Sequence, residues 1–206
     1  MIYGALLGAG YLFVSTREAT LVQLLVTFAL VVVASLLFFA LQAVSVNYAG
    51  GPSGKSFVKK TTYDGLRLIA VSVPLIVLTA LAFYGLGKIN SHLTVVVAVR
   101  YLLIGVIAPL LAIQLWLVAS RDGLRQLLRR APRAGARAFA PQSVFIYACG
   151  VLVFAIAPYL LIFHTTQTDR AWVEVSLLTI RLAASALLIL FGWVATVGTL
   201  SLLNKQ

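Results

Sequence analysis

The side chain with the clearest potential for chemistry is Arg181, a charged group inside the apolar stretch from Trp172 to Gln206. Arg181 follows Trp172 by nine residues and precedes Trp193 by twelve. At helical rise the two tryptophans lie about 31 Å apart, the thickness of a bilayer's hydrocarbon core. Since tryptophan favours both membrane interfaces, the pattern predicts a spanning helix with Arg181 about 13 Å deep. A charge at that depth costs at least about 2.5 kcal/mol unless it faces protein or water, so we expect Arg181 to point into a helix bundle.

Three kinds of partner for Arg181 remain open. The nearest carboxylate on the same helix face, Glu174, is seven residues earlier and about 10 Å away along the axis. Backbone carbonyls freed near Pro74 or Pro158, or a polar side chain such as Gln23, would give the guanidinium an internal structural role. Otherwise Arg181 contacts another protein or binds an anionic ligand.

Arg100 is the second arginine inside an apolar run. If Trp116 marks the cytoplasmic interface of that run, Arg100 lies only about 6 Å inside the outer interface. From there its long side chain can reach the headgroups beside Tyr101. We therefore expect a smaller functional role for Arg100 than for Arg181.

Composition places both arginines in a membrane protein. Of the 206 residues, 62% are hydrophobic and 10% are charged, with a mean hydropathy of +1.04, which is too apolar for a soluble domain. Lipid-exposed backbone must form helices or closed barrels, and the sequence lacks alternating strands of about ten residues, so we predict an all-α fold. We expect one integral membrane domain over residues 1–206, a polytopic bundle of three helical hairpins. Its five full spans are Leu21–Val46, Leu66–Leu86, Leu93–Ala119, Ser143–Phe163 and the final run from Trp172.

The N-terminal apolar run, Ile2 to Val14, has thirteen residues and as a helix reaches about 20 Å, short of a full span. No Lys or Arg precedes it, so the basic region of a signal peptide is missing. It is a re-entrant helix, a short span that thins the bilayer, or the remainder of a longer helix. We favour the last interpretation.

The distribution of positive charge predicts the orientation. Residues 47–67 and 120–142 hold ten of the sixteen Lys and Arg residues, and cytoplasmic loops carry such an excess. Both segments and the C-terminus with Lys205 are therefore expected in the cytoplasm. The net charge of +11 then reflects topology rather than a nucleic-acid partner, because no basic face with interleaved aromatic residues is present. Loops rich in Ala, Arg, Gly and Pro favour a bacterial inner (plasma) membrane.

The basic segment 120–142 is expected to contain a short amphipathic helix, with Asp122 placed to cap it. Leucines share one face, and arginines on the other face would contact anionic lipid headgroups or an acidic partner protein. The leucines are Leu124, Leu127 and Leu128, and the arginines are Arg125, Arg129 and Arg130.

Other patterns do not amount to a site. Residues 50–56 end like a phosphate-binding P-loop, but Ala49 occupies the first glycine position and no strand precedes the segment. His92 and His164 fall at helix ends without metal-ligand spacing, so we predict neither haem nor metal ligation, and no cofactor. Cys149 stands alone in an apolar run and is expected to be an inert, buried thiol.

No span carries a carboxylate pair, a Cys/His pair or a nucleophile elbow, so we do not expect an enzyme. The favoured hypothesis is an accessory or structural subunit of a larger membrane assembly, with lipids and other membrane subunits as partners. The alternative is a small transporter or channel-like protein for an anionic solute that binds Arg181. Pro74, Pro109 and Pro158 would then interrupt the helices around that charge.

The predicted orientation can be tested by labelling. Arg125→Cys in a Cys149→Ala background is expected to react with a membrane-impermeant maleimide only after permeabilisation, because residues 120–142 face the cytoplasm. His92→Cys in the same background is the control and is expected to react in intact cells. Labelling of the Arg125→Cys protein in intact cells would contradict the orientation.

Overall fold

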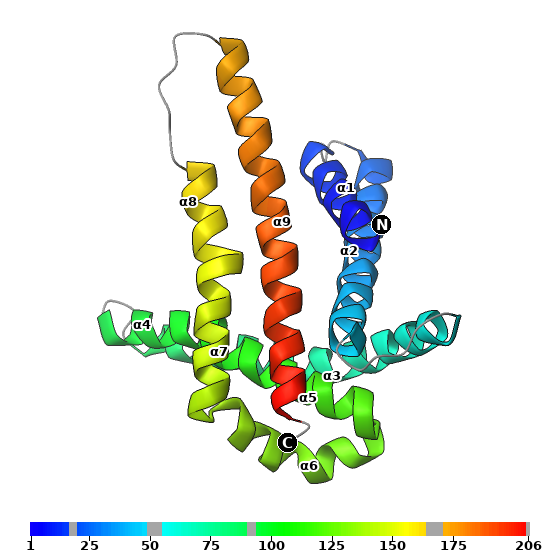
Figure 1. Cartoon of the computed structure of the whole chain (residues 1–206), viewed down its shortest axis with the longest axis vertical. Helices are drawn as coiled ribbons and strands as arrows, with labels where there is room; N and C mark the ends of the chain where they lie inside the picture. Colours follow the sequence, from blue (N-terminus) through cyan, green and yellow to red (C-terminus); the bar gives the residue numbers. More distant parts are fainter. Residues whose placement is uncertain (17–19, 49–54, 90–93, 164–170, 205–206) are drawn as a thin grey trace. The chain divides into compact units, whose positions relative to one another are not determined.

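The computed structural model describes residues 1–16, 20–48, 55–89, 94–163 and 171–204, and every element in them is helical (Figure 1). Five rods are long and apolar enough to cross a membrane, and the N-terminal helix is shorter. The predicted all-α helical membrane bundle is confirmed, as expected where backbone groups must bond within their own segment. The helices form two compact units, Met1–Gly135 and Ala136–Gln206. A single domain over residues 1–206 stays a prediction.

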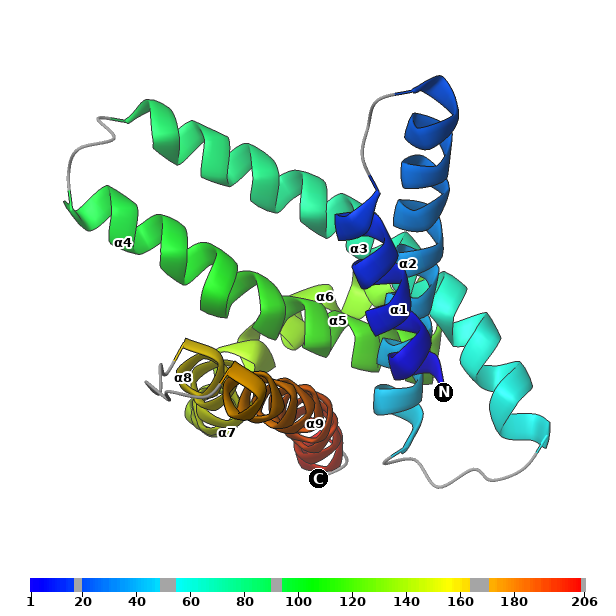
Figure 2. The same cartoon turned by 90° about the horizontal axis from the view of Figure 1, so that it is seen from above.

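The first unit contains the two N-terminal hairpins. Helix α1 packs against α2, α2 against α3, and α3 against α5. A single rod made of α4, the π-helix η1 and α5 returns alongside α3, whereas α3 crosses α2 (Figure 2). The bounds are α1 Ile2–Ser15, α2 Leu21–Tyr48, α3 Lys55–Lys88, α4 Thr94–Leu102, η1 Leu103–Ile107 and α5 Ala108–Asp122. The first unit ends within α6, which is Leu124–Ala138.

Helix α3 starts well before the predicted span. It begins at Lys55 rather than Leu66, so the last part of the predicted loop from Asn47 to Gly65 is helical. Lysine is a good helix former, and Asp64, which lies outside the predicted spans, is only 1% exposed. The loop prediction was wrong for residues 55–65. The first turns of α3 carry charged residues, so their low hydropathy excluded them from the predicted span.

Two spans contain one π-helical turn shortly before a proline. η1 (Leu103–Ile107) precedes Pro109, and η2 (Leu152–Ile156) precedes Pro158. Proline has no N–H, and its ring crowds the carbonyl four residues earlier. The π turn, in which an N–H bonds to the carbonyl five residues back, is wider and gives the ring room. Both turns share the sequence L-x-x-x-I-A-P, whereas α3 passes through Pro74 as a continuous α-helix.

The second unit is a helical hairpin whose two arms approach closely. The rod of α7, η2 and α8 packs along α9. Gly150 of the rod faces Thr196 of α9, and Gly192 of α9 faces Phe154. The hydroxyl of Thr196 donates to the carbonyl of Gly192 at 2.6 Å, so this polar side chain is satisfied within its own helix. The bounds are α7 Pro141–Val151, η2 Leu152–Ile156, α8 Ala157–Phe163 and α9 Ala171–Leu203.

Cys149 was expected to be buried, and the structure shows it exposed on α7. Its neighbour Gly150 is the residue that faces α9, and adjacent residues on an α-helix point about 100° apart. The prediction was wrong because an apolar run identifies a membrane helix without identifying which side of that helix is covered.

The close approach of α7 and α9 predicts the effect of a small substitution. Gly150→Ala is expected to lower the free energy of unfolding by about 1–3 kcal/mol, because a Cβ there would overlap the hydroxyl of Thr196. The measurement is denaturant unfolding of the purified protein in detergent micelles.

Gly198→Ala on α9 is the matched control, since nothing lies within 4 Å of a Cβ added at Gly198. This variant is expected to be neutral or slightly stabilising. Combining Gly150→Ala with Thr196→Ala should recover part of the loss. Equal unfolding free energies for wild type and Gly150→Ala would contradict a tight contact at Gly150.

Candidate functional site

Arg181 lies on α9 and faces the other arm of its own hairpin. It is half-buried and lines an open recess of about 880 Å³, whose second wall is α8 with Tyr159, Leu160 and Phe163. The rings of Tyr159 and Phe163 lie 4.7 Å apart. The recess therefore combines one cationic group with an aromatic and aliphatic wall, and it is open on one side.

Glu174, one of the partners suggested for Arg181 from the sequence, has other surroundings. Glu174 is exposed, and the structure describes no ion pair for it. The carbonyl of Pro158 accepts a long hydrogen bond of 3.5 Å from the hydroxyl of Ser185. The recess thus gathers Arg181 and α8, but it does not bring Glu174 onto the guanidinium.

Arg100 is held by the first unit rather than extended beside Tyr101. Its Cζ lies 3.8 Å from the centroid of the Phe83 ring on α3. Gly87, one turn further along α3, leaves space for the guanidinium, since a Cβ there would lie 3.4 Å from Nη2. A cation–π contact of this kind is worth about 0.5–2 kcal/mol. The Phe83 ring therefore covers part of the guanidinium, whose buried Nε makes no hydrogen bond in the described structure, and Tyr101 is 75% exposed.

The predicted amphipathic helix is present as α6 and is longer than expected, running from Leu124 to Ala138. Gly123 ends α5 with a φ of 80°, a conformation that favours glycine. Asp122 is therefore the last residue of α5 and does not cap α6, so that part of the prediction was wrong. Its carboxylate instead accepts a 2.6 Å hydrogen bond from Nη1 of Arg130.

One side of α6 is basic and exposed, with an arginine at every fourth position. The opposite side contains the buried Ala134 and Ala138, while Leu128, at the edge between the two sides, is 83% exposed. Two of the arginines extend the predicted headgroup face by the same spacing. The four are Arg125, Arg129, Arg133 and Arg137.

His92 and His164, the weak metal candidates, lie outside the described residues, as does the glycine-rich part of the P-loop-like segment. Within the part of the chain that the structure describes, no group of three His, Cys, Asp or Glu side chains is placed to hold a metal ion.

A buried polar cluster, which sequence reasoning missed, joins three helices of the first unit. We call it the Asp64 cluster; it consists of Asn47 of α2, Asp64 and Arg67 of α3, and Ser120 of α5. Asn47 Nδ2 and Ser120 Oγ each donate to Asp64 Oδ2 at 2.9 Å. Arg67 Nη1 lies 3.4 Å from Asp64 Oδ1. Asp64 is 1% exposed, and a carboxylate that deep in a protein needs such donors.

The Asp64 cluster is a structural tie, because its donors come from three different helices and converge on one carboxylate. The sequence contained a signal for it. Asn47, Asp64 and Ser120 each lie one or two residues beyond an end of a predicted span, all on the side expected to be cytoplasmic. Polar residues at adjacent span ends can meet, whereas the predicted spans left Asp64 outside any helix.

Removing the charge of Asp64 tests the cluster. Asp64→Asn is expected to lower the free energy of unfolding by about 1–3 kcal/mol, because the neutral amide loses the ion pair with Arg67: when its oxygen accepts from Asn47 and Ser120, its NH2 group faces Arg67 Nη1, another donor. Asp122→Asn is the matched control: its ion pair with Arg130 is partly exposed, at 25% and 49% for the two side chains, and should contribute less than about 1 kcal/mol. Equal losses in the two variants would contradict a special role for Asp64.

No protein-family model, curated protein or solved structure matches this chain. What the chain does must therefore follow from its own side chains. The features that matter are the Arg181 recess, the basic side of α6 and the internal Asp64 cluster, within a chain of five apolar helices long enough to span a membrane.

Proposed function

We propose that this chain is a non-enzymatic subunit of a larger membrane protein assembly, inserted in a bacterial inner membrane with its C-terminus in the cytoplasm. The observation that carries the proposal is the half-buried Arg181 beside an open recess in the second unit. A partner helix that carries an acceptor would enter this recess and bind the guanidinium from its open side.

The physical reason is the number of donors on a guanidinium. Arginine has five N–H donors and no acceptor, and the recess wall on α8 is formed by apolar and aromatic side chains such as Leu160 and Phe163. Charged side chains inside a membrane are costly and usually face protein or a water-filled cavity, so they often mark a place of interaction. A carboxylate or amide on a neighbouring subunit would supply acceptors in the geometry that arginine favours.

The spans also leave ample surface for partners. In the most apolar stretch of each span, at most 33% of residues are buried within the chain, and in α2 none is. Helix association in membranes uses packing and polar contacts rather than the hydrophobic effect. A polar group at an otherwise apolar helix face, such as Arg181, can therefore set the position of a partner.

The basic side of α6 fits the same arrangement. Four exposed arginines and the exposed Leu128 suit a helix lying at the membrane surface, with leucine toward the lipid chains and arginines on anionic headgroups. This contact would hold the cytoplasmic side of the chain at the bilayer surface.

The second candidate is a small transporter or channel-like protein for an anionic solute. One observation favours it: the Arg181 recess includes Ala157, directly after the π turn η2 and next to Pro158. Interrupted helices beside a charge are typical of transporter binding sites. The repeated L-x-x-x-I-A-P sequence at η1 and η2 places a similar interruption in a second span.

Substitution of Arg181 separates the two functions. Arg181→Leu is expected to reduce co-purification of membrane partners in gentle detergent by at least about tenfold, since one charge-assisted hydrogen bond contributes about 1.5–3 kcal/mol. Arg181→Lys should retain part of the association. Native mass spectrometry of the wild-type and variant complexes measures both.

Arg100→Leu is the charge-matched control, because Arg100 is stacked on Phe83 of its own unit. This variant should leave partner association unchanged. A wild-type chain that migrates alone in native detergent would contradict the subunit function. Flux of an anionic solute into proteoliposomes that is lost in Arg181→Leu would favour the transporter instead.

A further inference from the structure

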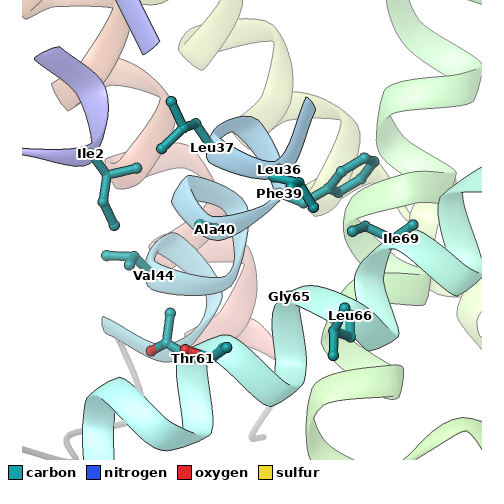
Figure 3. Close-up of a pocket in the computed structure, with 11 residues that line it drawn as sticks. Ile2, Leu36, Leu37, Phe39, Ala40, Val44, Thr61, Gly65, Leu66 and Ile69 are labelled. Carbon is teal, nitrogen blue, oxygen red and sulfur yellow. The ribbon is translucent and has the colours of Figure 1, made fainter. Parts of the chain in front are cut away.

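An apolar groove lies in the first unit where α3 crosses α2, with Ile2 of α1 at one side (Figure 3). Its volume is about 420 Å³. Leu37 and Val44 of α2 and Ile69 of α3 contribute to its wall, and Gly65 leaves its floor open. The groove is within the size range of small-molecule sites, and it is too small for a helix about 10 Å in diameter.

One polar group in this groove lacks a partner. Thr61 lines the groove and is 7% exposed, yet its hydroxyl makes no hydrogen bond within the described structure. Thr79 of the same helix donates to the carbonyl four residues earlier at 2.8 Å, which is the usual solution for a helical hydroxyl. A buried hydroxyl without a bond costs about 1–3 kcal/mol. The orphan hydroxyl of Thr61 therefore marks the place of an acceptor that the chain does not provide.

The position of Thr61 indicates the kind of acceptor. Lys60 precedes Thr61 directly, and the uncharged part of α3 starts only after Arg67, so Thr61 lies on the headgroup side of the boundary between headgroups and acyl chains. From Thr61 the groove continues to Ile69, which is about 12 Å along the helix into the apolar region. A water molecule needs two to four polar partners to be held, and apart from Thr61 and Thr62 the side chains that line the groove are apolar.

We propose that the groove binds one acyl chain of an anionic diacyl phospholipid, whose ester carbonyl accepts the hydrogen bond of Thr61. The ester has acceptors and no donor, so it satisfies the hydroxyl without leaving a new unpaired group. Lys60 is exposed at the same boundary and attracts a negatively charged headgroup. The lipid thus fills the angle between α2 and α3 and binds at a site separate from Arg181 and from the basic side of α6.

The test uses the full chain in nanodiscs of phosphatidylglycerol and phosphatidylcholine in equal parts, with retained lipid measured by native mass spectrometry. Wild type should retain phosphatidylglycerol. Thr61→Val keeps the shape of the side chain and should reduce retention about fivefold, the equivalent of one hydrogen bond of about 1 kcal/mol. Lys60→Gln should shift retention toward phosphatidylcholine.

Gly65→Leu is expected to abolish retention by filling the groove, since the nearest atom to a Cβ at Gly65 is the Phe39 carbonyl oxygen at 3.9 Å. Ala40→Leu, in the opposite wall, is a second filling variant. Leu78→Phe is the matched control, because Leu78 is on α3 outside the groove and is 64% exposed. It should retain lipid as wild type does.

Three results would overturn the proposal. The first is unchanged lipid retention in both folded filling variants. The second is a Thr61→Val protein with a higher melting temperature and unchanged retention, which would mean that the hydroxyl is simply unsatisfied. The third is a wild-type protein that retains an apolar molecule other than a phospholipid in the groove.

Discussion

The structure depends on one constraint, that a backbone in hydrocarbon must satisfy its own hydrogen bonds. The constraint makes every described element helical, and it also explains the departures from α geometry. Pro109 and Pro158 each remove a donor, and in both spans the chain forms a π turn within the helix rather than breaking it. The repeated sequence L-x-x-x-I-A-P shows that this local solution is encoded twice in one chain.

Because the backbone is satisfied within each helix, contacts between helices depend on side chains, and the two units use different ones. In the first unit, polar bonds bridge helices: the Asp64 cluster joins α2, α3 and α5, and Trp116 Nε1 donates to Ser72 Oγ at 2.8 Å. In the second unit, glycine lets backbones approach, as Gly150 does opposite Thr196. Polar bonds determine which side chains pair, whereas small residues allow a short distance between the helix backbones.

The sequence predicted the elements far better than the contacts. The fourth span, predicted as Ser143–Phe163, runs from Pro141 to Phe163 in the structure, because hydropathy along the chain reports which residues need an apolar surrounding. Hydropathy averages around the helix axis, so it could not show that Cys149 is exposed. It also assigned Asp64 to a loop, although a charged residue at a helix end can be buried when neighbouring helices supply donors.

The two arginines within the apolar spans show that the predicted depth in a membrane does not determine what surrounds a side chain. From the sequence they differ by how far each lies from an interface, yet the structure separates them by what surrounds them. Arg100 is stacked on Phe83 beside Gly87, and its buried Nε makes no hydrogen bond among the described residues. Arg181 faces an open recess with an aromatic and aliphatic wall on α8. Another molecule can reach a charge beside an open recess, which is why Arg181 rather than Arg100 is the residue expected to define a partner or a ligand.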